Sequence, residues 1–304
     1  MSHLAVVAAV CSAGFVLPGR MSLAPGRMPL ALERMPALTG GTPARWTVPL
    51  QMVADSSLDS DDGSFGKSLR RLQASPTRCA MLATYVAALF YVGSGTAPQG
   101  SPEETLKIIM ECLDQDAAPS IFFSIFNALG VLPAIYAAVL LPGANDQKPV
   151  PPAFIATSFA AGYGGLGPYL ILRQPRPEPI YRDDLGFLAR TVTESKLFGA
   201  GLLLASLGLA AKLTAIPDFD AALNTYWSLF DQFGIVNVSS FDLLVLSSFF
   251  FEPAQEDMRR RGWWAAPGEQ PTTLQVARLA AFCAVPVIGP AAYVLARPAL
   301  PERQ

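Results

Sequence analysis

Beyond residue 78 the chain alternates between long apolar runs and shorter polar segments. Six runs approach the roughly 20 residues that a helix needs to cross a bilayer. They cover residues 79–95, 120–142, 153–172, 197–216, 236–253 and 276–296. This pattern predicts an all-α fold, a polytopic transmembrane bundle with five or six hydrophobic helices after a cleaved presequence.

The composition supports lipid as the solvent of these runs. Hydrophobic residues make up 51% of the chain and charged residues 15%, whereas about 25% is usual in a globular protein. The mean hydropathy is +0.35. We therefore expect membrane lipids as partners. The net charge of −2 provides no basic field for a nucleic acid, so we expect no nucleic-acid partner.

Histidine and cysteine usage excludes several kinds of site. The only histidine is His3, in a segment that we expect to be removed, so no His-ligated haem or metal and no His-based catalysis is expected. The four cysteines form no C-x-x-C pair, which excludes a readable zinc site. The cofactor stays unknown, and no particular residue supports chlorophyll or carotenoid.

The N-terminal region has the composition of a targeting sequence. Residues 1–14 hold a short apolar run that ends in small residues, as signal peptides do, and residues 15–53 are Arg-bearing and acid-poor, as transit peptides are. Residues 54–77 form a polar and basic linker before the helical domain at 78–304. The paired segments resemble the bipartite presequence of nucleus-encoded plastid proteins in algae with complex plastids. That resemblance implies an integral protein of the thylakoid or inner envelope; a secreted protein with a Pro-rich stretch is the alternative.

Lysine and arginine in the loops bear on topology, because they concentrate on one side of a membrane. With six crossings these residues divide almost evenly between the two sides. If run 79–95 lies in the interface or docks on the bundle, the division becomes thirteen to three. We therefore favour five crossings, with Arg259, Arg260 and Arg261 as an anchor on the positive side. Binding of an anionic lipid by these arginines is the alternative.

Few polar side chains lie inside the runs, and such residues are candidates for function. Asn127 and Asp242 are the clearest; with Arg259, Arg260, Arg261 and Arg297 they complete the candidate positions, and no catalytic residue is expected. Asp242 stands beside two serines at the edge of its run, so we favour a helix-capping role for it. A functional buried carboxylate is the alternative. The amphipathic stretches 103–115 and 218–233 are expected on the membrane surface or over the bundle.

A short pattern occurs twice. GPYLILRQP at 167–175 and GPAAYVLARP at 289–298 each end a run with Gly-Pro, a tyrosine and an arginine that soon precedes proline. One interpretation is a duplicated unit of three segments. The other is that these residues are common at the ends of membrane spans.

Three resemblances to known families follow from short motifs. The Phe-Asp of 241–242, EDMRRRG at 256–262 and the closing P-x-x-GP-x-x-Y-x-L-x-RP resemble uncharacterised multi-span proteins of plastids and cyanobacteria, over roughly 120–300. RCAMLA at 78–83 is similar to the first helix of light-harvesting proteins, although Gln73 and Pro76 replace that family's ligands. Phe-Asp and the late Gly-Pro are similar to neoxanthin-synthesis proteins, without their histidine. The first resemblance implies a plastid membrane and no known activity.

These observations favour a non-enzymatic protein, a structural, assembly or accessory subunit that binds other membrane subunits. The alternatives are a pigment- or lipid-handling protein, including an enzyme on a lipophilic substrate, and a small transporter.

Overall fold

The computed structural model describes residues 75–114, 120–145, 149–174 and 180–303, all within one compact unit. These ranges are helical and contain no β-strand, which confirms the all-α prediction. The predicted signal-like and transit-like segments lie outside the described residues, as do residues 54–74 of the linker.

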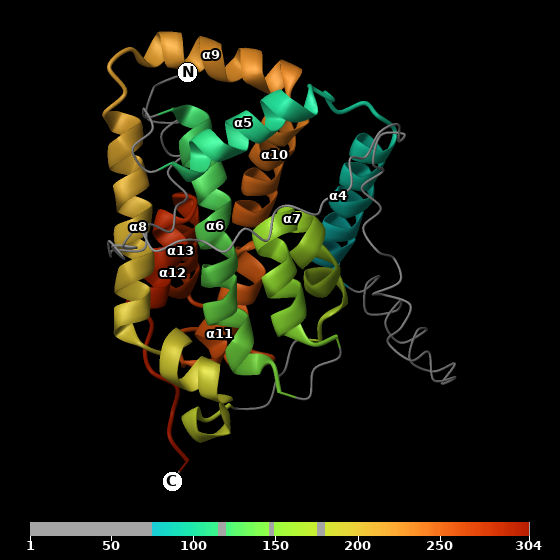
Figure 1. Ribbon diagram of the computed structural model, residues 1–304. Helices are drawn as coiled ribbons and strands as arrows, with labels where there is room; N and C mark the ends of the chain where they lie inside the picture. Colours follow the sequence, from blue (N-terminus) through green and yellow to red (C-terminus); the bar gives the residue numbers. More distant parts are fainter. Residues whose placement is uncertain (1–74, 115–119, 146–148, 175–179, 304) are drawn as a thin grey trace, which may run out of the picture. The chain divides into compact units, whose positions relative to one another are not determined.

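The first half of the unit consists of a long helix, a surface helix, a second long helix and a kinked helix, in that order. In Figure 1, α4 rises to the end of the bundle where α5 lies across it, α6 descends, and α7 follows. We call the end with α5 and α9 the cap end and the opposite end the arginine end. Their bounds are α4 Pro76–Gly93, α5 Pro102–Leu113, α6 Ile121–Leu140 with a 3₁₀ turn at Leu141–Gly143, and α7 Pro151–Leu172.

The second half repeats this order. Helix α8 rises, α9 lies across the cap end, and α10 descends into α11 at the arginine end (Figure 1). A pair of short helices then ends the bundle. The bounds are α8 Lys196–Thr214, α9 Phe219–Gln232, α10 Gly234–Phe249, α11 Phe251–Arg260, α12 Thr273–Ala284 and α13 Ile288–Ala296; short turns at Arg182–Asp184 and Ala189–Thr193 join the halves.

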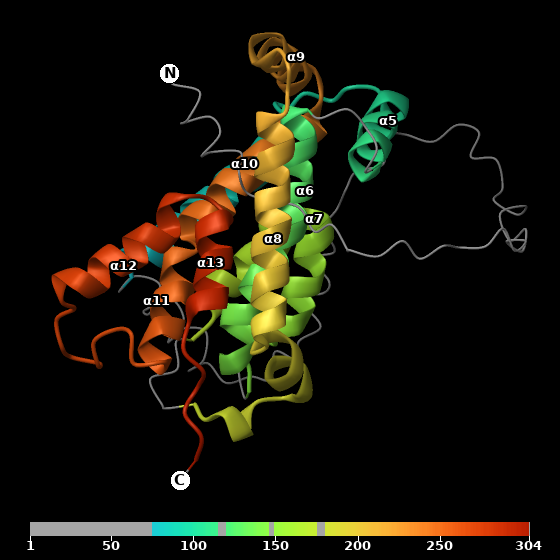
Figure 2. The same cartoon turned by 90° about the vertical axis from the view of Figure 1, so that its left-hand side faces the viewer.

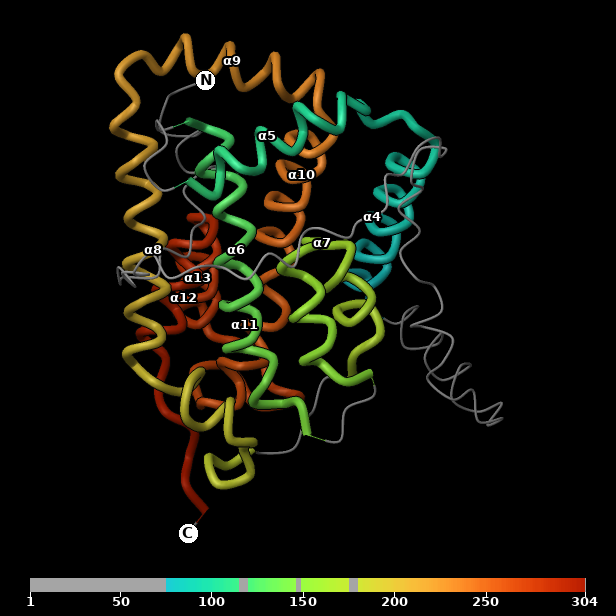
Figure 3. The backbone as a smooth tube through the Cα atoms, in the orientation of Figure 1, coloured from blue at the N-terminus to red at the C-terminus, as the bar shows by residue number. Residues whose placement is uncertain are grey.

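Helix α7 turns back on itself at Gly162. This glycine has φ +51° and ψ −128°, a conformation that is strained for a side-chain-bearing residue. The rings of Phe154 and Tyr169 then lie 5.9 Å apart, whereas a straight helix would separate residues fifteen apart by roughly 22 Å. Figure 3 shows the two arms side by side. Helix α7 is therefore a hairpin with both ends at the arginine end.

Helices α12 and α13 form the corresponding element. Val287 between them has φ +51°, α12 rises obliquely and α13 descends to the arginine end (Figure 2). The rings of Phe282 and Tyr293 lie 5.4 Å apart across the turn. Run 276–296 thus enters and leaves on one side of the bundle.

The two halves share the order of their elements, and several local features recur in their hairpins. In both hairpins a glycine presses against backbone seven residues earlier: Gly165 against Ser158, where an added Cβ would lie 2.7 Å from the amide nitrogen, and Gly289 against Phe282. Four residues later each hairpin has a buried tyrosine, and four residues after that a buried arginine. These are Tyr169 and Tyr293, and Arg173 and Arg297.

Three described helices are long and apolar enough to cross a membrane: Ile121–Gly143, Lys196–Thr214 and Gly234–Arg260. The prediction of five or six was too high, because apolar run length does not reveal where a helix turns back. Runs 153–172 and 276–296 are hairpins. Run 79–95 forms most of α4. The first turn of this helix contains the polar residues Thr77 and Arg78, so its apolar part is short.

The hairpins also change the topology that the charges favoured. Ten described lysines and arginines lie at the arginine end, while Lys107 and Lys212 lie at the cap end and Arg278 lies within α12. The ten are Arg78, Arg173, Arg182, Arg190, Lys196, Arg259, Arg260, Arg261, Arg297 and Arg303. This bias arises with α4 running from one end of the bundle to the other, so it does not require run 79–95 to lie in the interface.

Apolar side chains cover both the inside and the outside of the bundle. Helix α6 is the most enclosed of the three long helices, and Tyr136 on it donates a 2.7 Å hydrogen bond to the Leu246 carbonyl of α10. By contrast, Phe90 of α4 and Leu204 of α8 are 73% and 69% exposed. Exposed apolar faces of this kind suit a lipid environment.

Candidate functional site

A network of buried charges occupies the arginine end of the bundle. Its centre is α11, which carries Glu252, Glu256 and Asp257 on adjoining faces. Five arginines whose side chains are buried and a further glutamate, Glu194, surround these carboxylates. Because isolated charges are costly away from water, such groups persist only when they are paired and hydrogen-bonded.

The first hairpin is held by Glu252 and Glu256. Arg173, at the end of α7, forms ion pairs with both carboxylates, and Glu256 also pairs with Arg260 one turn further along α11. Arg78 of α4 joins the group through Glu252 at 3.5 Å and donates to the Arg173 carbonyl. These contacts connect α4, α7 and α11.

The second hairpin is held by Asp257. Its Oδ2 accepts hydrogen bonds from Arg297 at 2.9 Å, from Arg261 at 2.9 Å and from the Tyr293 hydroxyl at 2.7 Å. Glu194 bridges the two arginines, at 3.0 Å from Arg297 and 2.6 Å from Arg261. Helix α11 therefore binds the arginine of each hairpin with a different carboxylate.

Three of the predicted positions belong to this network. The side chains of Arg260, Arg261 and Arg297 are buried and paired with carboxylates, while the role of Arg259–Arg261 as a topology anchor or in lipid binding stays a prediction. Arg259 points elsewhere and donates to the Ala265 carbonyl at 3.2 Å. The acids, Arg78, Arg173 and Tyr293 were not among the candidate positions predicted from the sequence. The available signal was the four-residue spacing of Glu256 from Arg260 and of Asp257 from Arg261.

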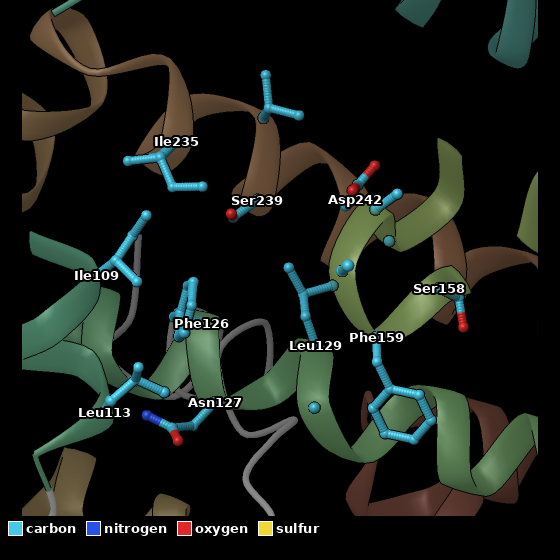
Figure 4. Close-up of a pocket in the computed structure, with 15 residues that line it drawn as sticks. Ile109, Leu113, Phe126, Asn127, Leu129, Ser158, Phe159, Ile235, Ser239 and Asp242 are labelled. Atoms are coloured by element: carbon cyan, nitrogen blue, oxygen red, sulfur yellow. The ribbon is translucent and has the colours of Figure 1, made fainter. Parts of the chain in front are cut away.

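The second feature is a cavity of about 470 Å³ on the cap side of the α7 hairpin. Figure 4 shows side chains from α5, α6, α7 and α10 around it. It lies between the halves, because α10 belongs to the second. Most of its lining is apolar, and the polar groups are Asn127, Ser158, Ser239 and Asp242. Its volume falls within the range of small-molecule sites.

Asp242 lies at the hairpin tip. Its carboxylate accepts a hydrogen bond from the Tyr163 backbone amide, which follows the turn at Gly162. An added Cβ at Gly162 would overlap Asp242 Oδ2. The glycine therefore permits both the turn and the approach of the carboxylate.

The capping role that the sequence favoured for Asp242 is wrong. Helix α10 begins at Gly234, with Phe233 at the N-cap and no side-chain cap, so Asp242 lies more than two turns inside the helix. The run begins at residue 236, close to the start of the helix, but Asn237, Ser239 and Ser240 made its continuous apolar part seem to start near Asp242. Asp242 is half-buried within α10, and the alternative, a functional buried carboxylate, stays a prediction.

Asn127 has a structural contact and also lines the cavity. Its amide donates to the Cys112 carbonyl of α5 at 2.9 Å and to the Phe123 carbonyl at 3.0 Å. This side chain ties the surface helix α5 to α6 at the wall of the cavity. Asn127 and Asp242 are the two predicted positions that meet at the cavity.

The comparisons with known proteins do not assign this site. No protein-family model, no curated protein and no solved structure matches the chain.

Proposed function

We propose that this protein is a membrane carrier for a small, largely apolar solute that bears one polar group, and that the solute binds in the Asp242 cavity. The observation that carries the proposal is the place of this cavity between two halves with the same order of elements, beside the tip of a broken helix. Carriers commonly consist of internal repeats, with the binding site between the repeats and next to discontinuous helices.

The chemistry of the lining supports the same function. A carboxylate within an apolar span is costly, and such groups often mark the pathway of a solute or an ion. Asp242 and the Ser239 hydroxyl provide an acceptor and a donor for one polar group, while residues such as Phe126 and Phe159 supply apolar surface.

This proposal selects the transporter among the three functions that the sequence left open. The accessory-subunit hypothesis explains the exposed apolar helices, but it gives no role to a cavity with a carboxylate. Co-migration of all the native protein with a larger complex, and none as a separate species, would favour that hypothesis again.

We also propose that the carrier resides in a plastid membrane. The support is the composition of residues 1–14 and 15–53. The expected mature N-terminus lies between about residues 45 and 65, and N-terminal sequencing that finds Met1 retained in the native protein would contradict this location.

Access to the cavity from both faces of the membrane is the expected property of a carrier. In a variant without the four native cysteines, Ser239→Cys will react with a membrane-impermeant maleimide added to sealed proteoliposomes. It will also react when the reagent is trapped inside. Reaction from one face only would contradict carrier function.

The substitution Gly130→Phe should block the cavity, and Gly208→Phe is its matched control. An added Cβ at Gly130, which lines the cavity, meets no atom within 4 Å, and the same holds for Gly208 on α8, away from the cavity. Gly130→Phe should slow the labelling of Ser239→Cys at least tenfold from both faces, whereas Gly208→Phe should leave it unchanged. Equal effects of the two substitutions would show that the labelled position does not lie in the cavity.

A further inference from the structure

Asp242 lacks a cationic partner among the described residues. Ion pairs hold carboxylates of α11 and Glu194 at the arginine end, but none reaches Asp242. Its one hydrogen bond comes from a neutral group, the Tyr163 amide. A carboxylate in this position needs a counter-charge or a proton.

The groups that surround Asp242 do not supply a charge. From α7 and α4 the facing titratable groups are the phenols of Tyr163 and Tyr85, which donate to the Met81 and Gly164 carbonyls. From α6, Asn127 is uncharged and its amide is bonded to backbone.

The surface helices do not supply one either. On α5, Lys107 and Glu111 pair with each other at 3.9 Å and are 77% and 63% exposed. On α9, Tyr226 bonds Ser240, and Asp220 and Asp231 are exposed. Counter-charge must then come from outside the described chain.

We propose, on the basis of the carrier function above, that the solute is a lipophilic organic monocation and that Asp242 exchanges it for a proton. The carboxylate holds one or the other. When the ammonium or iminium group of the solute binds, the Asp242 proton leaves to water; when the solute leaves, the carboxylate takes up a proton again. One positive charge moves each way, so the exchange is electroneutral.

The geometry suits such an alternation. The Tyr163 amide remains a donor to Asp242 in either state, so the hairpin tip is held while the second carboxylate oxygen changes its partner. Phe126 and Phe159 offer aromatic surface in the cavity (Figure 4), and aromatic faces attract cations.

Proton release caused by a cation is the expected result. Proteoliposomes that contain the full chain and a trapped pH indicator are prepared with an acidic interior, and ethidium is added outside as the probe. Ethidium should raise the internal pH and accumulate inside. Its apparent affinity should fall about tenfold for each unit of external acidification, within the range where Asp242 binds a proton.

Asp242→Asn provides the decisive comparison. The amide oxygen still accepts from Tyr163, so the fold is kept, but the side chain no longer exchanges a proton. Ethidium-driven proton movement should fall at least a hundredfold in Asp242→Asn and remain in Asp231→Asn, an exposed acid on α9. Equal thermal unfolding of the variants checks their folding.

Two outcomes separate this inference from the carrier proposal. If Ser239→Cys reacts from both faces but ethidium moves no protons, or moves them equally in Asp242→Asn, the exchange is overturned and the carrier stands. If Ser239→Cys reacts from one face only and ethidium moves no protons, both proposals are overturned.

Discussion

Replacement of Asp257 by leucine will destabilise the folded protein by about 3–5 kcal/mol, the usual cost when one partner of a buried ion pair is removed. Asp257 is fully buried and accepts hydrogen bonds from Arg261, Arg297 and Tyr293. Without it, Glu194 alone faces two arginines. The second hairpin is then held more weakly, and thermal unfolding of the purified protein should occur at a markedly lower temperature.

Two further variants make this result specific. Asp183→Leu removes an exposed acid that pairs with Arg190, and a surface pair contributes about 0–1 kcal/mol, so its unfolding temperature should hardly change. Arg297→Leu added to Asp257→Leu should cost less than the sum of the two single changes, because the residues interact directly. Additive effects would mean that Asp257 does not hold the hairpin through Arg297.

Gly162→Ala will disrupt the cavity at the tip of the first hairpin. The backbone there has φ +51° and ψ −128°, which costs a residue with a side chain about 1–3 kcal/mol. The new Cβ would also overlap the Asp242 carboxylate. We expect a destabilisation of at least this size and loss of ethidium-driven proton movement.

Gly164→Ala is the control, two residues away. Its added Cβ would meet only the Ala161 side chain, at 3.9 Å, and replacing a helical glycine by alanine favours the helix by roughly 0.5–1 kcal/mol. Stability should be kept or increased. If Gly162→Ala were equally well tolerated, the proposed turn at Gly162 would be wrong.

The sequence predicted the helical class of the described residues. It did not predict that two runs turn back, because hydropathy measures the length of an apolar run and not its direction. Gly162 is one of four glycines within six residues. The second turn lies at Val287, where nothing in the residue type predicts a positive φ.

The sequence predicted only part of the candidate site, because it does not show which distant segments meet in the fold. Asn127 and Asp242 stood out as polar residues within spans, and the structure brings both to one cavity. The acids of α11 lay beyond the apolar run, where charged residues are expected to be solvated. Their burial depends on Arg173 and Arg297, which arrive from hairpins distant in sequence.

Thiol accessibility tests the hairpin form of α7, on which the proposed carrier function depends most directly. Val150 and Gln174 flank α7 and are exposed, as is Glu103 on α5 at the cap end. In proteoliposomes of one orientation, Val150→Cys and Gln174→Cys should both react with an impermeant maleimide from the same face, and Glu103→Cys should react from the opposite face. Reaction of Val150→Cys and Gln174→Cys from opposite faces would show that α7 crosses the membrane and would contradict the two-hairpin carrier.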